Sequence, residues 1–144
     1  MPTRKEYKVN PLDLKRNKAV GVKLPLGGDP LFSLSYTTEE QAISNLKNLL
    51  LTRKGERPFQ PTFGTDIYSL LFEQISEQLS SDLEESLRND IQYWLPYIII
   101  DEINIITNED YNRIDISLKV KVTEQGANVV INMMITEQGN ITIV

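Results

Sequence analysis

Residues 113–122 alternate strictly between polar and apolar side chains, and this alternation limits what the last third of the chain can become. The apolar members are Ile114, Ile116, Leu118, Val120 and Val122, and the polar members up to residue 121 are Arg113, Asp115, Ser117, Lys119 and Lys121. A period of two places the two sets on opposite faces of a β-strand. The stretch therefore predicts a strand with one buried face and one wet face, as in an antiparallel sheet.

Other segments of β character accompany this strand. Residues 98–107 are rich in isoleucine, residues 129–136 are mostly apolar, and the last residues are Ile141, Thr142, Ile143 and Val144. Short turn sequences separate these segments, and short connections join strands that run antiparallel. We expect a mainly antiparallel sheet over about residues 98–144.

Two stretches upstream of the sheet repeat their apolar residues with the spacing of an α-helix. The first covers about residues 39–54, where Thr38 is placed to cap a helix whose apolar face holds Ala42, Ile43, Leu46, Leu49 and Leu50. The second covers about residues 77–95, with Leu79, Leu83, Leu87 and Ile91 at steps of four. A shorter helix is predicted between them, over about residues 66–74.

The fold class that follows is α+β, with three helices packed on the antiparallel sheet. One domain is predicted over residues 19–144, because 144 residues with 40% apolar content suit a single core. Residues 19–26 alternate in polarity and contain Pro25, which predicts an edge strand or an extended segment. Residues 1–18 are polar and basic, and we expect an arm that is either flexible or ordered by a partner.

A loop rich in proline and phenylalanine connects the first two predicted helices. Its members are Arg53, Lys54, Gly55, Glu56, Arg57, Pro58, Phe59, Pro61, Phe63 and Gly64. The prolines restrict the unfolded chain, and the phenylalanines supply apolar surface to bury, so we expect a rigid loop. Glu56 and Arg57 either pair with each other to fix the loop or contact another subunit.

The run Thr-Arg-Lys-Gly-Glu-Arg-Pro-Phe-Gln-Pro-Thr-Phe-Gly, followed by Leu-Leu-Phe-Glu, resembles the baseplate wedge subunit family of T-even-like contractile phage tails. Relatives of that family occur in other contractile machines, including type VI secretion. The resemblance implies a structural subunit at the inner baseplate, present in multiple copies, on which the tail sheath begins to polymerise. It implies a place in the virion tail baseplate, reached by assembly in the host cytoplasm.

The resemblance also implies two surfaces that contact partners. Family members dock on other wedge subunits through a Glu-Pro-Arg triplet after the long helix, where this chain has Leu95, Pro96 and Tyr97. Because the two charges are absent, we expect docking through Trp94, Pro96 and Tyr97, although Trp94 and Leu95 also fit a core position. The sheath subunit is expected at Ile141, Thr142 and Ile143, where a terminal strand offers an edge.

Composition excludes several other functions. The chain has no histidine and no cysteine, which removes the usual general base, the thiolate nucleophile and the usual metal ligands, and no cofactor is expected. A net charge of −5 argues against a nucleic-acid partner. No apolar run approaches the roughly 20 residues that span a bilayer, and no export signal or membrane partner is expected.

Older descriptions of some family members as lysozyme-like raise the alternative of a peptidoglycan glycoside hydrolase. Such an enzyme needs two carboxylates across a cleft, one of them protonated. The candidate acids are Glu56, Asp66, Glu73, Asp101 and Glu102. Cations surround Glu56 in the sequence and favour its ionised form, so we expect no catalytic residue. A small adaptor module without any link to a tail is a third alternative.

Overall fold

The computed structural model describes residues 17–24, 26–27, 30–70, 77–108, 110–111, 113–122, 126, 128–136 and 141–143. Most of the predicted basic arm, the second half of the helix predicted at 66–74, and Glu73 lie outside the described residues. The chain divides into two compact units, Met1–Asn45 and Leu46–Val144. Helix α1 (Thr38–Leu51) contributes its first half to one unit and its second half to the other.

The first unit contains a two-stranded antiparallel ladder. Strands β1 (Gly21–Val22) and β2 (Leu34–Ser35) pair so that Gly21 lies opposite Ser35. The N–H of Val20 donates to the carbonyl of Ser35 at 2.8 Å, which extends the pairing beyond the short strand. Of residues 19–26, Gly21 and Val22 thus form the strand, and the main-chain bonds of Val20 and Lys23 to Ser35 and Ser33 flank it.

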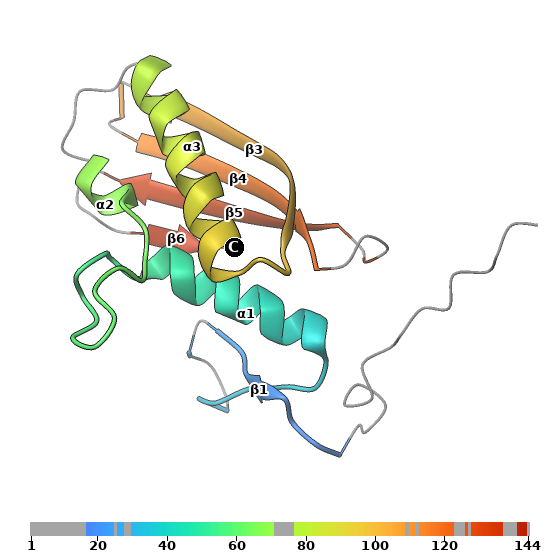
Figure 1. Cartoon of the computed structure of the whole chain (residues 1–144). Coiled ribbons are helices and arrows are strands. Elements are labelled where there is room, and N and C mark those ends of the chain that lie inside the picture. Colours follow the sequence, from blue (N-terminus) through green and yellow to red (C-terminus); the bar gives the residue numbers. More distant parts are fainter. Residues whose placement is uncertain are drawn as a thin grey trace, which may run out of the picture. The chain divides into compact units, whose positions relative to one another are not determined.

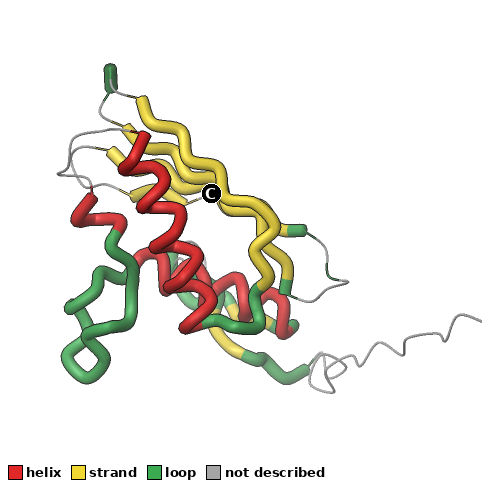
Figure 2. Tube along the Cα trace, turned by 45° about the horizontal axis from the view of Figure 1, so that its top comes forward, coloured by secondary structure: helices red, strands yellow, loops and turns green. Residues whose placement is uncertain are grey.

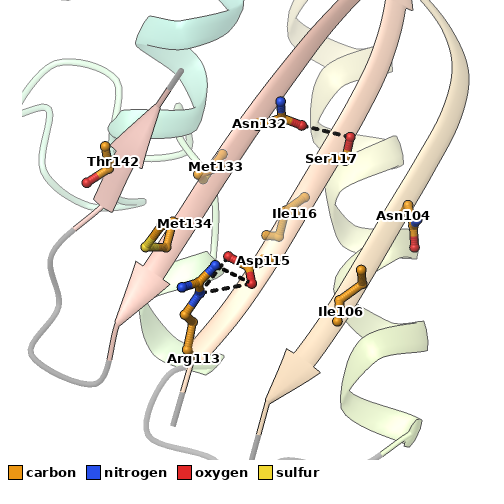
Figure 3. Close-up of a pocket in the computed structure, with 10 residues that line it drawn as sticks. All are labelled: Asn104, Ile106, Arg113, Asp115, Ile116, Ser117, Asn132, Met133, Met134 and Thr142. Carbon is orange, nitrogen blue, oxygen red and sulfur yellow. Dashed lines mark hydrogen bonds and ion pairs between the residues drawn. The ribbon is translucent and has the colours of Figure 1, made fainter. Parts of the chain in front are cut away.

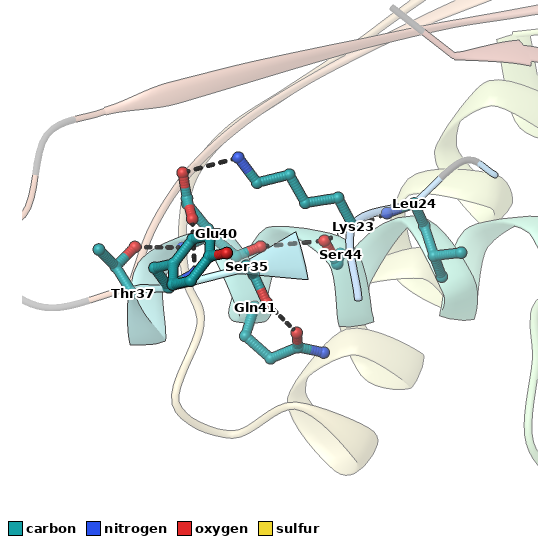
Figure 4. Close-up of polar contacts among 8 residues, drawn as sticks. Lys23, Leu24, Ser35, Thr37, Glu40, Gln41 and Ser44 are labelled. Carbon is teal, nitrogen blue, oxygen red and sulfur yellow. Dashed lines mark hydrogen bonds and ion pairs between the residues drawn. The ribbon is translucent and has the colours of Figure 1, made fainter. Parts of the chain in front are cut away.

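The residue that caps helix α1 is Thr37, one position before the cap predicted at Thr38. The hydroxyl of Thr37 accepts the N–H of Glu40 at 3.1 Å, and the Glu40 carboxylate accepts the N–H of Tyr36 at 3.0 Å (Figure 4). The ammonium group of Lys23 lies 2.9 Å from the same carboxylate. The Tyr36 N–H and Lys23 together hold the pKa of Glu40 below its ordinary value of 4.5. The Thr37–Glu40 spacing is that of a capping box, which fixes where the helix starts.

The second unit is built on a four-stranded antiparallel meander, as predicted. The strands are β3 (Ile99–Asn108), β4 (Arg113–Lys121), β5 (Val129–Thr136) and β6 (Ile141–Ile143), and they follow each other in space in chain order (Figure 1). In the central register, Leu118 of β4 lies opposite Ile103 of β3 and Ile131 of β5. The strict alternation of residues 113–121 appears as alternating buried and half-buried positions.

Helix α3 (Glu77–Trp94) runs along one face of this sheet (Figures 1 and 2). Its stripe at steps of four, which is formed by Leu79, Leu83, Leu87 and Ile91, is at most 4% exposed. The sheet contributes residues of β4 and β5 that are equally buried: Ile114, Ile116, Leu118, Val120, Ile131, Met133 and Ile135. Helix α2 (Ile67–Leu70) is a single turn that begins with the buried Ile67. The residues predicted from periodicity therefore form much of the observed core of this unit.

Candidate functional site

Residues 53–64, here called the motif loop, fold back on themselves through main-chain hydrogen bonds. The N–H of Gly55 donates to the carbonyl of Pro61 at 2.6 Å, and the N–H of Phe63 donates to Gln60 at 3.0 Å. At the base of the loop, the N–H of Thr65 donates to the carbonyl of Thr52 at 2.9 Å. These bonds satisfy backbone groups that an open loop would leave to water, so the loop has a defined conformation.

Two glycines make this conformation possible. Gly55 has φ +88° and follows the end of α1, and Gly64 has φ +125° at the base of the loop. A β-carbon at Gly64 would lie 2.5 Å from the carbonyl oxygen of Thr52. The base of the loop therefore closes only with glycine at residue 64.

The charged side chains of the motif loop have structural partners, although these differ from the predicted Glu56–Arg57 pair. A Glu56 carboxylate oxygen accepts the N–H of Arg53 at 3.1 Å. The guanidinium of Arg57 instead lies over the ring of Phe63, with 3.9 Å between Cζ and the ring centroid. Arg53 lies over Tyr68 at the same distance. Among the described residues, Glu56 and Arg57 thus fix the loop through a main-chain group and a ring rather than through each other.

Lys54 joins the motif loop to two other segments. Its ammonium group lies 2.6 Å from a carboxylate oxygen of Asp66 and 2.9 Å from one of Asp90 in α3. Burial alone would lower the pKa of Lys54, but the hydrogen bonds that its ammonium group donates to the two carboxylates outweigh burial and raise the pKa above 10.5. The second carboxylate oxygen of Asp90 is buried and has no hydrogen-bond partner among the described residues. Sequence reasoning did not find this arrangement, because Asp90 lies far along the chain on a helix with many acids.

The two phenylalanines of the motif loop have opposite environments. Phe63 is 9% exposed, and its ring centroid lies 5.2 Å from that of Trp94 in an edge-to-face arrangement. Phe59 is 100% exposed. The expectation that Phe59 would be buried to hold the loop is therefore wrong, because the loop is held by hydrogen bonds, by Phe63 and by Lys54, while Phe59 lies at its outer turn.

The end of α3 carries the residues predicted to dock on other subunits. Leu95 is 6% exposed and belongs to the core, whereas Trp94 is half-buried between Phe63 and Tyr93. Pro96 is exposed, and Tyr97 is 43% exposed. Tyr93, which the sequence reasoning did not include, is 74% exposed beside Trp94. The structure thus places an aromatic surface here, next to the motif loop.

Strand β6 lies at one edge of the four-stranded sheet and pairs with β5 alone among the described strands. Ile141 and Ile143 are half-buried, while Thr142 is exposed and lies opposite Met134. On the same face as Thr142 lies a hollow of about 330 Å³ whose lining includes Ile106 and Met134 (Figure 3). Figure 3 also shows the ion pair of Arg113 and Asp115, at 2.8 Å, beside this hollow.

Three of the carboxylates proposed for a hydrolase are engaged by other groups, while Glu102 is exposed on β3. Glu56 accepts a main-chain N–H, Asp66 pairs with Lys54, and Asp101 pairs with Lys121 at 2.9 Å. In the described part of the chain, no three His, Cys, Asp or Glu side chains come together as a metal site would require. No described helix has both the length and the apolar character needed to cross a membrane.

The second unit is thus a small α+β fold that combines an antiparallel meander, one long covering helix and an ordered proline-rich loop. The family model described as "Baseplate wedge protein gp25" matches residues 37–127, so the chain belongs to the gp25 family of baseplate wedge proteins. The resemblance of the motif loop to that family is confirmed.

Individual relatives agree with this assignment. The baseplate wedge protein gp25 of Enterobacteria phage T4 is 32% identical over 72 residues, which is 49% of this chain and 54% of the relative. The matched region thus spans about half the length of that curated relative.

Two solved structures share the fold at 20% identity and TM-score 0.59. One is a candidate tail lysozyme from Geobacter sulfurreducens, matched over 67% of this chain and 88% of that chain. The other belongs to the baseplate of the anti-feeding prophage, matched over 69% and 80%.

Proposed function

We propose that this chain is a structural, non-catalytic subunit of a contractile-tail baseplate wedge, present in several copies in the virion. Membership of the gp25 family supports this function, as does the similarity in fold to a chain from the anti-feeding prophage baseplate. The proposed partners are other wedge subunits and the tail sheath subunit, and assembly takes place in the host cytoplasm. No nucleic acid, membrane or cofactor takes part.

The observation that carries the sheath contact is the position of β6. An edge strand has main-chain N–H and C=O groups that point away from its only neighbour and can pair with a strand of another protein. Main-chain pairing supplies affinity, and the alternation of side chains fixes the register. The first sheath ring would in this way continue the order β3-β4-β5-β6 with a strand of its own.

The docking contact to other wedge subunits is assigned to Trp94, Pro96 and Tyr97. Aromatic side chains that are partly exposed beside a rigid element are favoured as interface anchors. Trp94 is held in place by Phe63 on one side and by Tyr93 on the other, so this surface is already ordered before a partner arrives. An apolar contact here replaces the charged triplet that the family uses.

A glycoside hydrolase is the second candidate, and the description of the Geobacter neighbour as a tail lysozyme is the observation that favours it. Glu56 and Asp66 argue against it, because a general acid needs a proton and a free approach to substrate. Glu56 and Asp66 are engaged in holding the motif loop, where a proton would break the contact.

Two measurements test the proposal. Purified tails from the gene cluster that encodes this chain should contain the chain in a fixed ratio to wedge and sheath subunits by quantitative mass spectrometry. The purified chain should clear peptidoglycan no faster than a heat-inactivated control. Absence from intact tails, or clearing that disappears in Glu56→Gln, would show that the proposal is wrong.

A further inference from the structure

Phe59 combines two properties that rarely occur together. Its side chain is 100% exposed, although it lies in a loop whose main chain is fixed by hydrogen bonds on both sides of it. The bond from Gly55 N–H to Pro61 O spans the residue, and the bond from Gln60 N–H to Arg57 O closes the turn around it at 3.2 Å. A large apolar ring on a rigid turn gains nothing for the folded chain itself, because it leaves no apolar surface out of water.

The neighbouring cations give this turn a definite chemical character. The guanidinium groups of Arg53 and Arg57 lie over the rings of Tyr68 and Phe63. In the described part of the chain, neither guanidinium donates a hydrogen bond, so their N–H donors are available to an outside acceptor. Residues 53–64 hold three cations and one carboxylate on a chain whose net charge is −5. A partner that complements the turn therefore offers an apolar pocket with carboxylates at its rim.

We propose that the motif loop inserts Phe59 into an apolar pocket on another protein, rimmed by carboxylates that accept hydrogen bonds from Arg57 and Arg53. This contact is additional to the α3 end and to β6. It deepens the proposed function by adding a third contact, and it concerns a protein other than a second copy of this chain. An anchor that is rigid before binding loses little conformational entropy on insertion, which is a property of strong interface residues.

Because Phe59 is fully exposed, a substitution there tests binding without changing the stability of the folded chain. Phe59→Ala removes no buried contact, so its thermal unfolding should coincide with that of the unaltered chain. Tagged Phe59→Ala and unaltered chain are produced in equal amounts together with the rest of the gene cluster, and their ratio is measured in purified tails. The variant should be depleted roughly tenfold or more, which is the effect of losing an interface anchor. Phe59→Leu should be depleted far less, and Tyr111→Ala, which removes another exposed ring (78% exposed), should enter at the unaltered level.

A photo-crosslinking arm identifies the partner. p-Benzoylphenylalanine at residue 59 of the full chain is activated in the producing cells, and the crosslinked peptides are sequenced. We expect one peptide of one other protein, from a pocket that contains apolar residues and carboxylates. Any of three results would overturn the inference. Phe59→Ala could enter tails at the unaltered level, residue 59 could crosslink only to this same chain, or its crosslinks could scatter over unrelated surfaces.

The two arms also separate this inference from the proposed function. If the chain is absent from tails but residue 59 still crosslinks to one acid-rimmed pocket, the function is wrong and the inference stands. If the chain is present in tails and residue 59 finds no such pocket, the function stands and the inference is wrong. Absence from tails together with no single crosslink contradicts both.

Discussion

The ring of Phe63 meets the ring of Trp94 edge to face, with 5.2 Å between the centroids and 67° between the planes. This contact joins the motif loop to the C-terminal end of α3, which lies about thirty residues further along the chain. The second link is Lys54, which reaches Asp90 one turn before the same helix end. Loop and helix end are thus held as one rigid surface, and several measurable consequences follow from it.

Phe63→Ala should lower the free energy of unfolding by about 3–5 kcal/mol, because it removes a buried ring and leaves a cavity against Trp94. Phe59→Ala in the same loop is the matched control and should stay within about 0.5 kcal/mol of the unaltered chain. Denaturant unfolding followed by the fluorescence of Trp94 measures both. Equal destabilisation by the two variants would contradict the assignment of Phe63 as the anchor of the loop.

Gly64→Ala and Gly55→Ala compare two glycines of the same loop that share a positive φ and differ in surroundings. An added methyl group at Gly55 meets nothing within 4 Å, so only the backbone strain of about 1–2 kcal/mol applies. At Gly64 it collides with the Thr52 carbonyl, so we expect about 2–4 kcal/mol. Urea unfolding of the two variants in parallel distinguishes them. The test is whether Gly64→Ala lowers the free energy of unfolding more than Gly55→Ala does, whatever the two values are.

Lys54→Met should lower the free energy of unfolding by about 1–3 kcal/mol, because it leaves the Asp90 carboxylate half-buried without its cation. The folded-state pKa of Lys54 is raised above 10.5, so its contribution is complete below that pH and is lost as pH rises through the folded-state pKa. The stability difference between the unaltered chain and Lys54→Met should therefore be constant near neutrality and shrink above about pH 10.5.

The control for Lys54→Met is Arg88→Gln, which removes the exposed pair with Glu84 on the same helix. Both side chains of that pair are largely exposed, and such pairs contribute little. Its unfolding midpoint in urea should be close to that of the unaltered chain. If Arg88→Gln lowered the free energy of unfolding more than Lys54→Met does, water would be solvating Asp66 and Asp90 well enough in the absence of Lys54.

Periodicity predicted those helices and strands in which a single repeat of apolar residues defines the buried face. The alternation of residues 113–122 gave β4, which ends one residue earlier at Lys121, and the steps of four from Leu79 to Ile91 gave the buried face of α3. The helix cap was misplaced by one residue, because Thr37 and Thr38 are the same residue type and both are placed to cap the helix, and the observed cap is Thr37.

The motif loop contains contacts that local sequence patterns could not predict. Phe59 and Phe63 are the same residue type four positions apart, yet one is fully exposed and the other is buried. The difference depends on Trp94, a residue whose proximity no local pattern reveals. Similarly, Glu56 and Arg57 were expected either to pair with each other or to contact another subunit, whereas Glu56 accepts the N–H of Arg53 and Arg57 lies over the ring of Phe63.

Tyr97→Glu should leave the chain folded and remove it from complexes with other wedge subunits. Tyr97 is 43% exposed, so the loss of its ring costs little in the folded chain, while a carboxylate in an apolar interface is strongly unfavourable. Co-purification of a tagged chain with the wedge proteins of its own gene cluster measures the effect. Tyr111→Glu, at another exposed tyrosine, is the control, and normal co-purification of Tyr97→Glu would place the docking surface elsewhere.

The last prediction concerns the free edge of β6. Successive residues of an antiparallel edge strand direct their N–H groups alternately toward the neighbouring strand and away from it. Thr142→Pro and Ile143→Pro therefore each remove one donor, and only one of the two removes a donor that faces outward. The variant that loses the outward donor should keep its pairing with β5 and its melting temperature, and it should still enter the baseplate.

The same variant should fail to start a sheath, because a proline ring on the free edge blocks the approach of a further strand. The other variant should unfold more easily, because it breaks a bond to β5. Electron microscopy of tails assembled with each variant, together with thermal unfolding of each purified chain, separates the two effects. Full-length sheaths on tails that carry the stable variant would show that the sheath does not join this strand.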